Sequence, residues 1–181
     1  MKATRLRIPD VVLIEPKVFE DDRGFFFESF NQAQFEASIQ AQGNFVQDNH
    51  SRSTRNVVRG LHYQIRQPQA KLVRVIAGTI FDVAVDLRRA SPTFGQWVAE
   101  ELSAGNRKQM FIPVGFAHGF AVLSDAAEVL YKTTDYWAPA HERCIAWDDK
   151  DLSIAWPLMG DAVVSAKDAQ GTALKAAEVF D

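Results

Sequence analysis

The chain has 181 residues, 47% of them hydrophobic, with thirteen phenylalanines and four tryptophans, so it can bury a sizeable core and is not a disordered chain. Its formal net charge is −3 and its pI is about 5.8, which gives no indication of a nucleic-acid partner. Cys144 is the single cysteine, which excludes an intramolecular disulfide framework and indicates a reducing compartment.

The N-terminal segment carries an apolar run of only four residues, at positions 11–14. A signal peptide or a membrane-spanning helix needs a much longer run. We also find no repeat, no low-complexity tract and no linker in the sequence. We therefore expect residues 1–181 to form one domain of a soluble, cytoplasmic protein without a membrane partner.

The first expected segments, in chain order, are a strand closed by a proline, a turn and an aromatic strand, at residues 11–19, 21–24 and 25–30. The one clear helix follows them. Asn31 is its expected N-cap, because Phe35 and Ile39 come next at a spacing of four. Gly43 stands where such a helix would stop.

From residue 45 onward, strands dominate, with turns at 77–78 and 113–115. The expected strand segments are 57–65, 71–88, 96–102, 108–123 and 127–137, before a mixed tail from residue 152. Alternation in residues 81–88 puts Phe81, Val83, Val85 and Leu87 on one face and Asp82, Ala84, Asp86 and Arg88 on the other. Many short strands without a βαβ rhythm predict a mainly β, antiparallel sandwich or barrel, whose mouth can hold a ligand.

His62 lies in the middle of an expected strand, in the stretch RGLHYQ at 59–64. Three roles are open from the residue alone: a metal ligand, a proton carrier or a structural side chain. Gly60 and Gln64 stand where a metal-binding barrel would place further ligands, and glutamine is a poor ligand for transition metals. The pattern therefore does not favour a metal, and a structural histidine is the simplest interpretation of the residue by itself.

Strand periodicity places His62 and Gln64 on one face, whereas Arg59 falls on the other. Arg59 can join them only through a bulge or at the rim of the barrel. Upstream, Gln47 and Asn49 share one face, and their neutral amides suit a sugar or a pyrimidine. The alternative for that pair is a solvated strand edge.

Lys71 and Tyr131 are polar exceptions in strongly apolar strands. Together with His62 they offer a base, a cation and a weak acid. This set suits removal of a proton next to a carbonyl, because the cation can stabilise the enolate oxygen and the phenol can return a proton. Asp168 would have to orient the imidazole, although spacing alone does not establish that contact.

Nine motifs in order resemble the dTDP-4-dehydrorhamnose 3,5-epimerase family, from about residue 4 to the end of the chain. They are FEDDRGFFFESF, FVQDNHSRS, VVRGLHYQ, KLVRVIAGTIFDVAVDLR, SPTFGQW, IPVGFAHGF, YKTTDYW, HERCIAWDD and SAKDAQG. The resemblance implies a cupin-type jelly roll with a few short helices. It also implies a homodimer with strand exchange and a redox-neutral reaction that needs no cofactor and no metal.

The resemblance further implies site residues. His62 is similar to the general base, Tyr131 to the general acid, Asp168 to the partner of the histidine and Lys71 to the group that stabilises the enolate. Substrate-binding positions map onto Arg23, Glu28, Gln47, Asn49, Arg59, His118, Trp137, Glu142 and Lys167. The two arginines would suit a diphosphate, and the aromatic at 137 would stack on thymine. Arg23 and Glu28 would act across the dimer.

Three positions depart from the family pattern: Asn56 and Cys144 replace common glycines, and Trp137 replaces a tyrosine. A small packed thiol is the interpretation we give to Cys144. The implied substrate is dTDP-4-dehydro-6-deoxy-D-glucose, epimerised at C3 and C5. A mono-epimerase and a ketoisomerase stay open as alternatives, with a metal-dependent cupin and a non-catalytic sugar-nucleotide binding module behind them.

Overall fold

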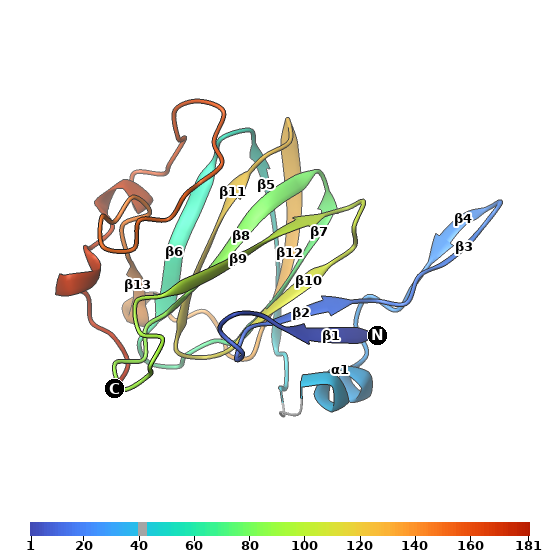
Figure 1. Ribbon diagram of the computed structural model, residues 1–181, viewed down its shortest axis with the longest axis horizontal. Helices are drawn as coiled ribbons and strands as arrows, with labels where there is room; N and C mark the ends of the chain where they lie inside the picture. Colours follow the sequence, from blue (N-terminus) through green and yellow to red (C-terminus); the bar gives the residue numbers. More distant parts are fainter. Residues whose placement is uncertain (40–42) are drawn as a thin grey trace.

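The computed structural model describes residues 1–39 and 43–181, and two antiparallel sheets packed face to face form its body (Figure 1). The strands of the larger sheet, in spatial order, are β1 (Lys2–Arg5), β2 (Val12–Glu15), β10 (Gln109–Ile112), β7 (Lys71–Ala77), β12 (Ala126–Thr133) and β5 (Gln47–Thr54). Neighbouring strands in this sheet often lie far apart in the chain, as a jelly roll requires.

The smaller sheet contains β13 (Glu142–Cys144), β6 (Val58–Gln64), β11 (Phe116–Val122), β8 (Thr79–Asp86) and β9 (Trp97–Ser103), in that spatial order. A separate hairpin of β3 (Phe19–Asp21) and β4 (Gly24–Phe26) projects from the body, on the right in Figure 1. Every strand pair in these sheets is antiparallel. The predicted mainly β jelly roll of the cupin type is therefore confirmed.

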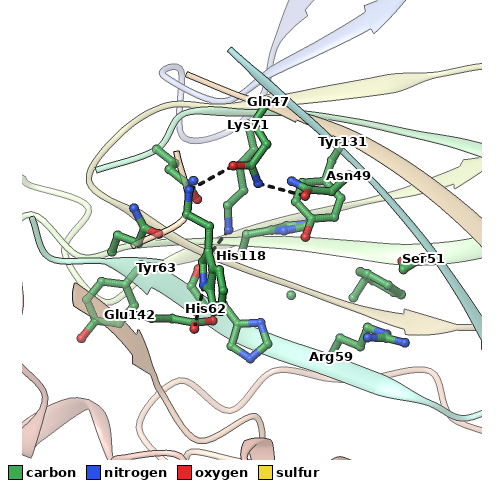
Figure 2. Close-up of a pocket in the computed structure, with 15 residues that line it drawn as sticks. Gln47, Asn49, Ser51, Arg59, His62, Tyr63, Lys71, His118, Tyr131 and Glu142 are labelled. Atoms are coloured by element: carbon green, nitrogen blue, oxygen red, sulfur yellow. Dashed lines mark hydrogen bonds between the residues drawn. The ribbon is translucent and has the colours of Figure 1, made fainter. Parts of the chain in front are cut away.

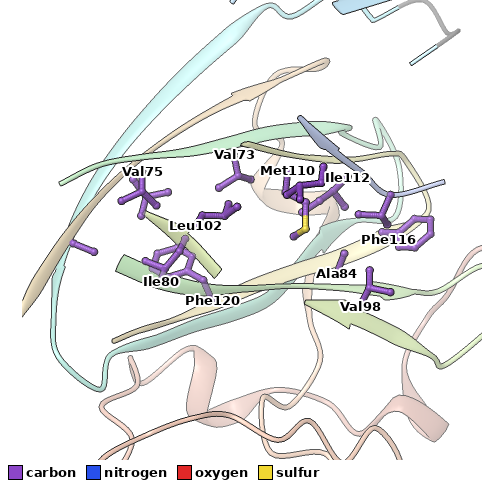
Figure 3. Close-up of a cluster of buried hydrophobic side chains, with 14 of the residues drawn as sticks. Val73, Val75, Ile80, Ala84, Val98, Leu102, Met110, Ile112, Phe116 and Phe120 are labelled. Carbon is purple, nitrogen blue, oxygen red and sulfur yellow. The ribbon is translucent and has the colours of Figure 1, made fainter. Parts of the chain in front are cut away.

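The central core fills the space between the two sheets (Figure 3). Val73 and Met110 from the larger sheet meet Ala84, Leu102 and Phe120 from the smaller one, and all five side chains are buried. Burial of apolar area at about 25 cal/mol per Å² makes this layer the main source of cohesion between the sheets. Near the edge of the sandwich formed by β5 and β6, the inner faces carry polar side chains instead.

The C-terminal tail covers the outer face of the smaller sheet. The outward-facing Val83 and Val85 of β8, with Leu87 just after it, pack in one cluster with Ile145, Leu152 and Phe180. The tail contains two short 3₁₀ helices, η2 (Asp168–Gln170) and η3 (Leu174–Ala176), and a third, η1 (Pro139–His141), precedes it. The predicted alternation in residues 81–88 is present, but both faces of β8 are buried.

Helix α1 (Gln32–Ile39) packs on the outer face of the larger sheet. The Asn31 side chain accepts a hydrogen bond from the backbone N–H of Gln34 at 3.1 Å, so the predicted N-cap is confirmed. Phe35 and Ile39 are buried, as their spacing predicted. The prediction that the helix stops at Gly43 depends on residues 40–42, which lie outside the described residues.

Three expected strands are shorter than their sequence patterns indicated, and the first of them, expected at 11–19, ends at Glu15, before the proline. The aromatic run at 25–30 leaves the hairpin after Phe26, and Phe30 turns inward to contact the Phe35 ring at a centroid distance of 5.7 Å. The strand expected to reach residue 137 ends at Thr133 instead. There the Thr133 hydroxyl donates to the Asp135 carbonyl at 2.9 Å, and such local hydrogen bonds compete with strand pairing.

No helix in the described part of the chain has the length and apolar character needed to cross a membrane.

Candidate active site

A cavity of about 390 Å³ opens at this polar edge of the sandwich, between the two sheets (Figure 2). Its lining residues come from both sheets and from the loop after β12. They are Gln47, Asn49, Ser51, Arg59, His62, Tyr63, Gln64, Gln69, Lys71, His118, Gly119, Phe120, Tyr131, Trp137 and Glu142. The cavity therefore gathers most of the residues that the sequence analysis singled out.

A β-bulge in β6 brings Arg59 to the same cavity as His62. His118 of β11 pairs with His62, but Phe120 pairs with Arg59, so three steps on β6 match two on β11. The extra residue reverses the alternation of side chains. The bulge that the strand-face argument required is therefore present, and Arg59 is held there by a 2.9 Å hydrogen bond from its Nε to the Ser53 hydroxyl.

Gly60 makes this bulge sterically feasible. Its φ is +122°, and a Cβ at this position would lie 2.5 Å from the Gly119 Cα and 2.8 Å from the His118 carbonyl oxygen. Only glycine fits such a close approach of two strands. Gly60, at a position where a metal-binding barrel would place a ligand, is therefore required for the backbone geometry of the bulge.

His62 and Asp168 form a hydrogen-bonded pair, with 2.6 Å between Nε2 of the ring and Oδ1 of the carboxylate. The Asp168 side chain is 5% exposed. Asp168 is the first residue of η2, which the tail places behind β6. Burial raises the pKa of Asp168, but the hydrogen bond and charge of His62, together with hydrogen bonds from Gly60 and Ser165, outweigh it and leave the pKa below its usual value. The ionised carboxylate accepts a hydrogen bond from Nε2–H, which leaves Nδ1 as the basic atom of the ring.

Lys71 is a buried cation beside this pair. Its Nζ donates a hydrogen bond to the His62 carbonyl oxygen at 3.3 Å, from the first residue of β7. Burial lowers the pKa of the ammonium to about 8, although the nearby charges of Asp82 and Glu142 oppose the shift. Lys71 is therefore protonated at neutral pH and carries its charge in a poorly solvated place, where it interacts strongly with an anion.

Tyr131 faces the cavity from β12, on the opposite sheet from His62. Its ring centroid lies 6.5 Å from that of His118. Burial raises the pKa of the phenol, so the hydroxyl keeps its proton at neutral pH and can donate it. The base and the phenol thus stand on opposite walls of one cavity (Figure 2).

His118 lines the same cavity and forms a second histidine–carboxylate pair. Its Nε2 lies 2.7 Å from Oδ1 of Asp82, and both side chains are buried. Burial lowers the pKa of His118, so the ring is neutral at pH 7. Sequence reasoning named His118 but missed Asp82, for which the only signal was an aspartate inside the apolar strand FDVAVDL.

Trp137 lies over the rim, 59% exposed, and two partners fix its position. Its backbone N–H donates to Oε1 of Gln47 at 3.0 Å, and its indole N–H donates to Glu142 at 3.1 Å. Glu142 also accepts from Lys167 at 2.6 Å, and Gln47 donates to Asn49 at 2.9 Å. The five residues form one connected group at the mouth of the cavity.

Gln64 occupies the expected face beside His62 but has a supporting role. Its side-chain oxygen accepts from the Ala138 N–H at 2.8 Å, and its amide donates to the Gln67 carbonyl at 2.7 Å. The first of these bonds attaches the loop that carries Trp137 to β6.

Arg23 and Glu28 do not reach the cavity within this chain. Arg23 is at the tip of the projecting hairpin, where its 90% exposed side chain pairs with Asp21. Glu28 accepts hydrogen bonds from Asn31 at 3.2 Å and Gln34 at 2.7 Å, near the start of α1. The structure of one chain therefore brings together eleven of the thirteen expected site residues, counting Lys167 through its contact with Glu142.

His62, Cys144 and Asp168 are the one group in the described residues with enough close ligand atoms to be considered for a metal. The thiol lies 3.9 Å from Oδ1 of Asp168, and burial raises its pKa to about 12. A thiol that keeps its proton is a poor ligand, and the other two residues already bond to each other. The donor chemistry does not fit a resident metal, and Cys144 packs as a small side chain.

Comparisons with known proteins agree on one family. A family model described as dTDP-4-dehydrorhamnose 3,5-epimerase matches residues 5–176. The chain is 67% identical over 180 residues to the enzyme of that name from Pseudomonas aeruginosa, with 99% of each chain covered. It is 52% identical over 181 residues to the one from Shigella flexneri, again with 99% of each covered.

A solved structure shows the same fold with a sugar nucleotide bound. The dTDP-6-deoxy-D-glucose-3,5-epimerase of Legionella pneumophila, in complex with dTDP-4-keto-L-rhamnose, aligns with a TM-score of 0.96 at 49% identity. The alignment covers 98% of this chain and 94% of that one.

Proposed function

The chain belongs to the dTDP-4-dehydrorhamnose 3,5-epimerase family, and from this membership we propose the part that each residue of the cavity plays in the reaction. The protein is an isomerase that epimerises dTDP-4-dehydro-6-deoxy-D-glucose at C3 and C5 and forms dTDP-4-dehydro-L-rhamnose. The C4 ketone acidifies the protons on both neighbouring carbons, so the reaction consists of proton transfers and is redox-neutral.

His62 is the general base of the proposal. The 2.6 Å contact with Asp168 is the observation that carries it, because the carboxylate fixes the ring and stabilises the imidazolium that forms. Nδ1 takes a proton from the carbon next to the ketone, and the negative charge moves to the ketone oxygen. The Lys71 ammonium stabilises that enolate oxygen.

Tyr131 is the general acid of the proposal. Inversion at a carbon requires the proton to leave from one face of the sugar and return to the other. His62 on β6 and Tyr131 on β12 come from opposite sheets, which suits this requirement. The phenol donates its proton at C5, and a second round at C3 completes the product.

The mouth of the cavity suits the nucleotide. Trp137 offers an exposed indole face for stacking on thymine, next to the amides of Gln47 and Asn49. Arg59 suits the diphosphate, since a guanidinium pairs with phosphate oxygens in a forked geometry. Glu142 and Lys167 close the rim through their 2.6 Å ion pair.

A homodimer with an exchanged hairpin completes the site in this proposal. Phe19, Phe25 and Phe26 on the projecting hairpin are 53%, 60% and 67% exposed, and exposed aromatic side chains at this density mark an interaction surface. Arg23 stands at the tip of the same hairpin. With the hairpin on a second copy, Arg23 and Glu28 would reach the cavity of the partner.

Co-expression of two defective subunits tests the exchange. If Arg23 acts in the partner's site, a heterodimer of His62→Ala and Arg23→Ala subunits contains one site with both residues intact. Activity should then rise well above that of either homodimer. Unchanged activity in a verified heterodimer would show that both residues act within one chain.

We also propose that residues 1–181 form one domain and that the protein is cytoplasmic, a location that a single free thiol suits.

Incubation with the 4-keto sugar nucleotide in heavy water, followed by NMR, tests the reaction. Deuterium at both C3 and C5 is expected. Label at one carbon would indicate a mono-epimerase, a ketone moved to C3 would indicate a ketoisomerase, and no label would indicate a binding module. Activity after extensive chelation is also expected, and its loss would favour a metal-dependent cupin.

A further inference from the structure

Asp82 is a buried carboxylate in the middle of β8 whose hydrogen bonding is incomplete. Its side chain is fully buried, and Oδ1 lies 2.7 Å from Nε2 of His118. Oδ2 has no hydrogen-bond partner among the described residues. Leaving a buried charged oxygen unpaired is costly, so a fold that keeps one indicates a use for the charge.

The strand register directs Asp82 toward the cavity. Asp82 pairs with Phe120 on β11, and Ala84 pairs with His118. Ala84 packs in the core between the sheets, and Asp82 is on the same face of β8 as Ala84. Asp82 therefore lies on the inner face of the smaller sheet, behind His118.

We infer that Asp82 is a positioning residue of this active site, which holds His118 in the tautomer that accepts a hydrogen bond from the sugar and balances the charge of the Lys71 ammonium. This inference rests on the proposed function, because it concerns residues that act on the same substrate. Asp82 acts through His118 and Lys71, and it does not contact the reacting atoms itself.

The tautomer follows from the hydrogen bond. A carboxylate has no proton to donate, so the hydrogen in the 2.7 Å contact must be on Nε2 of His118. Burial lowers the pKa of His118, and the charges of Lys71 and His62 lower it further, although Asp82 opposes the shift. The ring is therefore neutral and its Nδ1 carries a lone pair. His118 accepts a hydrogen bond from a sugar hydroxyl and does not serve as a second acid.

The charge balance concerns Lys71. The ammonium is buried, and the pKa of about 8 reflects a large desolvation penalty that Asp82 and Glu142 partly offset. The titratable or charged groups around the cavity that faces Lys71 are Arg59, His62 and Tyr63 on β6, Asp82 on β8, His118 on β11, Tyr131 on β12 and Glu142 on β13. Strand β10, which also pairs with β7, contributes no titratable side chain at 109–112.

Of the two carboxylates that raise the pKa of Lys71, Asp82 has the larger effect. Glu142 is less available for this purpose, because it already pairs with Lys167 at 2.6 Å. Removal of the Asp82 charge should therefore make the ammonium lose its proton at a lower pH.

The test is the pH profile of kcat/KM for Asp82→Asn, which removes the charge and keeps the shape. The fall of kcat/KM on the alkaline side should occur about one pH unit lower than in the wild type. This is the low end of the pKa shift that a nearby opposite charge causes. Asp48→Asn is the matched control, because Asp48 is 55% exposed, pairs with Lys132 and lies outside the catalytic cavity. Its profile should match that of the wild type.

The possible outcomes are distinct. An unmoved alkaline limb in a folded, active Asp82→Asn protein would overturn the inference and leave the proposed function intact. If the wild type itself incorporates no deuterium, that result contradicts the proposed function and not the role of Asp82 alone.

A second measurement needs no variant. Histidine ¹⁵N NMR of the wild-type protein should show His118 neutral, with the proton on Nε2, at pH 7. A proton on Nδ1, or a charged ring at that pH, would overturn the inference even if Asp82→Asn does not fold.

Discussion

His62 and Asp168 are 106 positions apart in the chain, and their side chains meet at 2.6 Å. The tail that carries Asp168 packs on the outer face of the smaller sheet, and η2 places the carboxylate behind β6. Packing of the tail therefore orients His62, the base that we propose. A change that loosens the tail should reduce activity even where it touches no cavity residue.

Replacement of the base is the most direct test. His62→Ala should lower kcat/KM by about 100- to 10,000-fold, because a positioned acid or base contributes that much. Asp168→Asn should also lower it, since the amide no longer stabilises the imidazolium. Deuterium incorporation into the 4-keto sugar nucleotide measures both. His50→Ala is the control, because His50 is half exposed, pairs with Glu128 and lies outside the cavity. Near-wild-type activity of His62→Ala would contradict the assignment of His62 as the general base.

Tyr131→Phe separates proton removal from inversion. His62 can still remove a proton and return a deuteron to the same face, so exchange should continue. Inversion at C5 should fall by about 100- to 10,000-fold, because the acid on the opposite wall is gone. NMR distinguishes labelled substrate from labelled product. Tyr136→Phe serves as control, since Tyr136 is 62% exposed and does not line the cavity. Equal losses of exchange and inversion would argue against Tyr131 as the acid.

Periodicity and turn residues were sufficient to predict the fold class, the N-cap at Asn31 and the face shared by His62 and Gln64. These features depend on short-range geometry, in which alternation and spacing have direct physical meaning. From the same alternation, Arg59 could join the site only through a bulge or at the rim of the barrel. The structure meets it through the Gly60 bulge, which the sequence itself did not reveal.

The residues that the sequence left unresolved depend on long-range packing. The Asp168 contact requires the tail to fold over the smaller sheet, which no local pattern encodes. Asp82 was missed because alternation separates the two faces of a strand but does not say whether the polar face meets water or a cavity. Arg23 is exposed at the hairpin tip of one chain, and its proposed place in the site would require a second copy of the chain.

Lys71 should reduce stability while it supports catalysis. Its pKa is about 8 in the folded protein, against 10.5 for an unperturbed lysine, so the folded state binds the proton less tightly than the unfolded state. The sign follows from proton linkage: the penalty is complete below about pH 8 and is relieved as the pH rises from 8 to 10.5.

Lys71→Met should therefore raise the free energy of unfolding at pH 7 by about 1–3 kcal/mol, since one pKa unit corresponds to about 1.4 kcal/mol and the lost hydrogen bond to His62 offsets part of the gain. The difference from wild type should shrink above pH 8. Denaturant titrations at several pH values measure it, and deuterium exchange should show loss of activity. A variant that is less stable at every pH would contradict the predicted penalty.

The wild-type rate should fall on the alkaline side with an apparent pKa near 8, because the enolate loses its cation when Lys71 loses its proton. The kcat/KM profile from pH 6 to pH 10 measures this limb. A profile that stays flat through pH 9 would show that the ammonium is not required.

Gly60→Ala should destabilise the protein through a clash and not only through backbone conformation. The new Cβ would lie 2.5 Å from the Gly119 Cα, and both atoms belong to paired strands that cannot separate without breaking the His62–His118 register. Gly24→Ala is a matched control, because Gly24 has a φ of +123° but no atom within 4 Å of the added Cβ. Both variants carry the conformational penalty of a positive φ, about 1 kcal/mol or more.

Chemical denaturation should show a larger loss of stability for Gly60→Ala than for Gly24→Ala. The rate of deuterium exchange should also be lower for Gly60→Ala, because the bulge sets the direction of His62. Equal losses for the two variants would mean that the strands can accommodate the methyl group and that the close approach of Gly60 to Gly119 does not position the base.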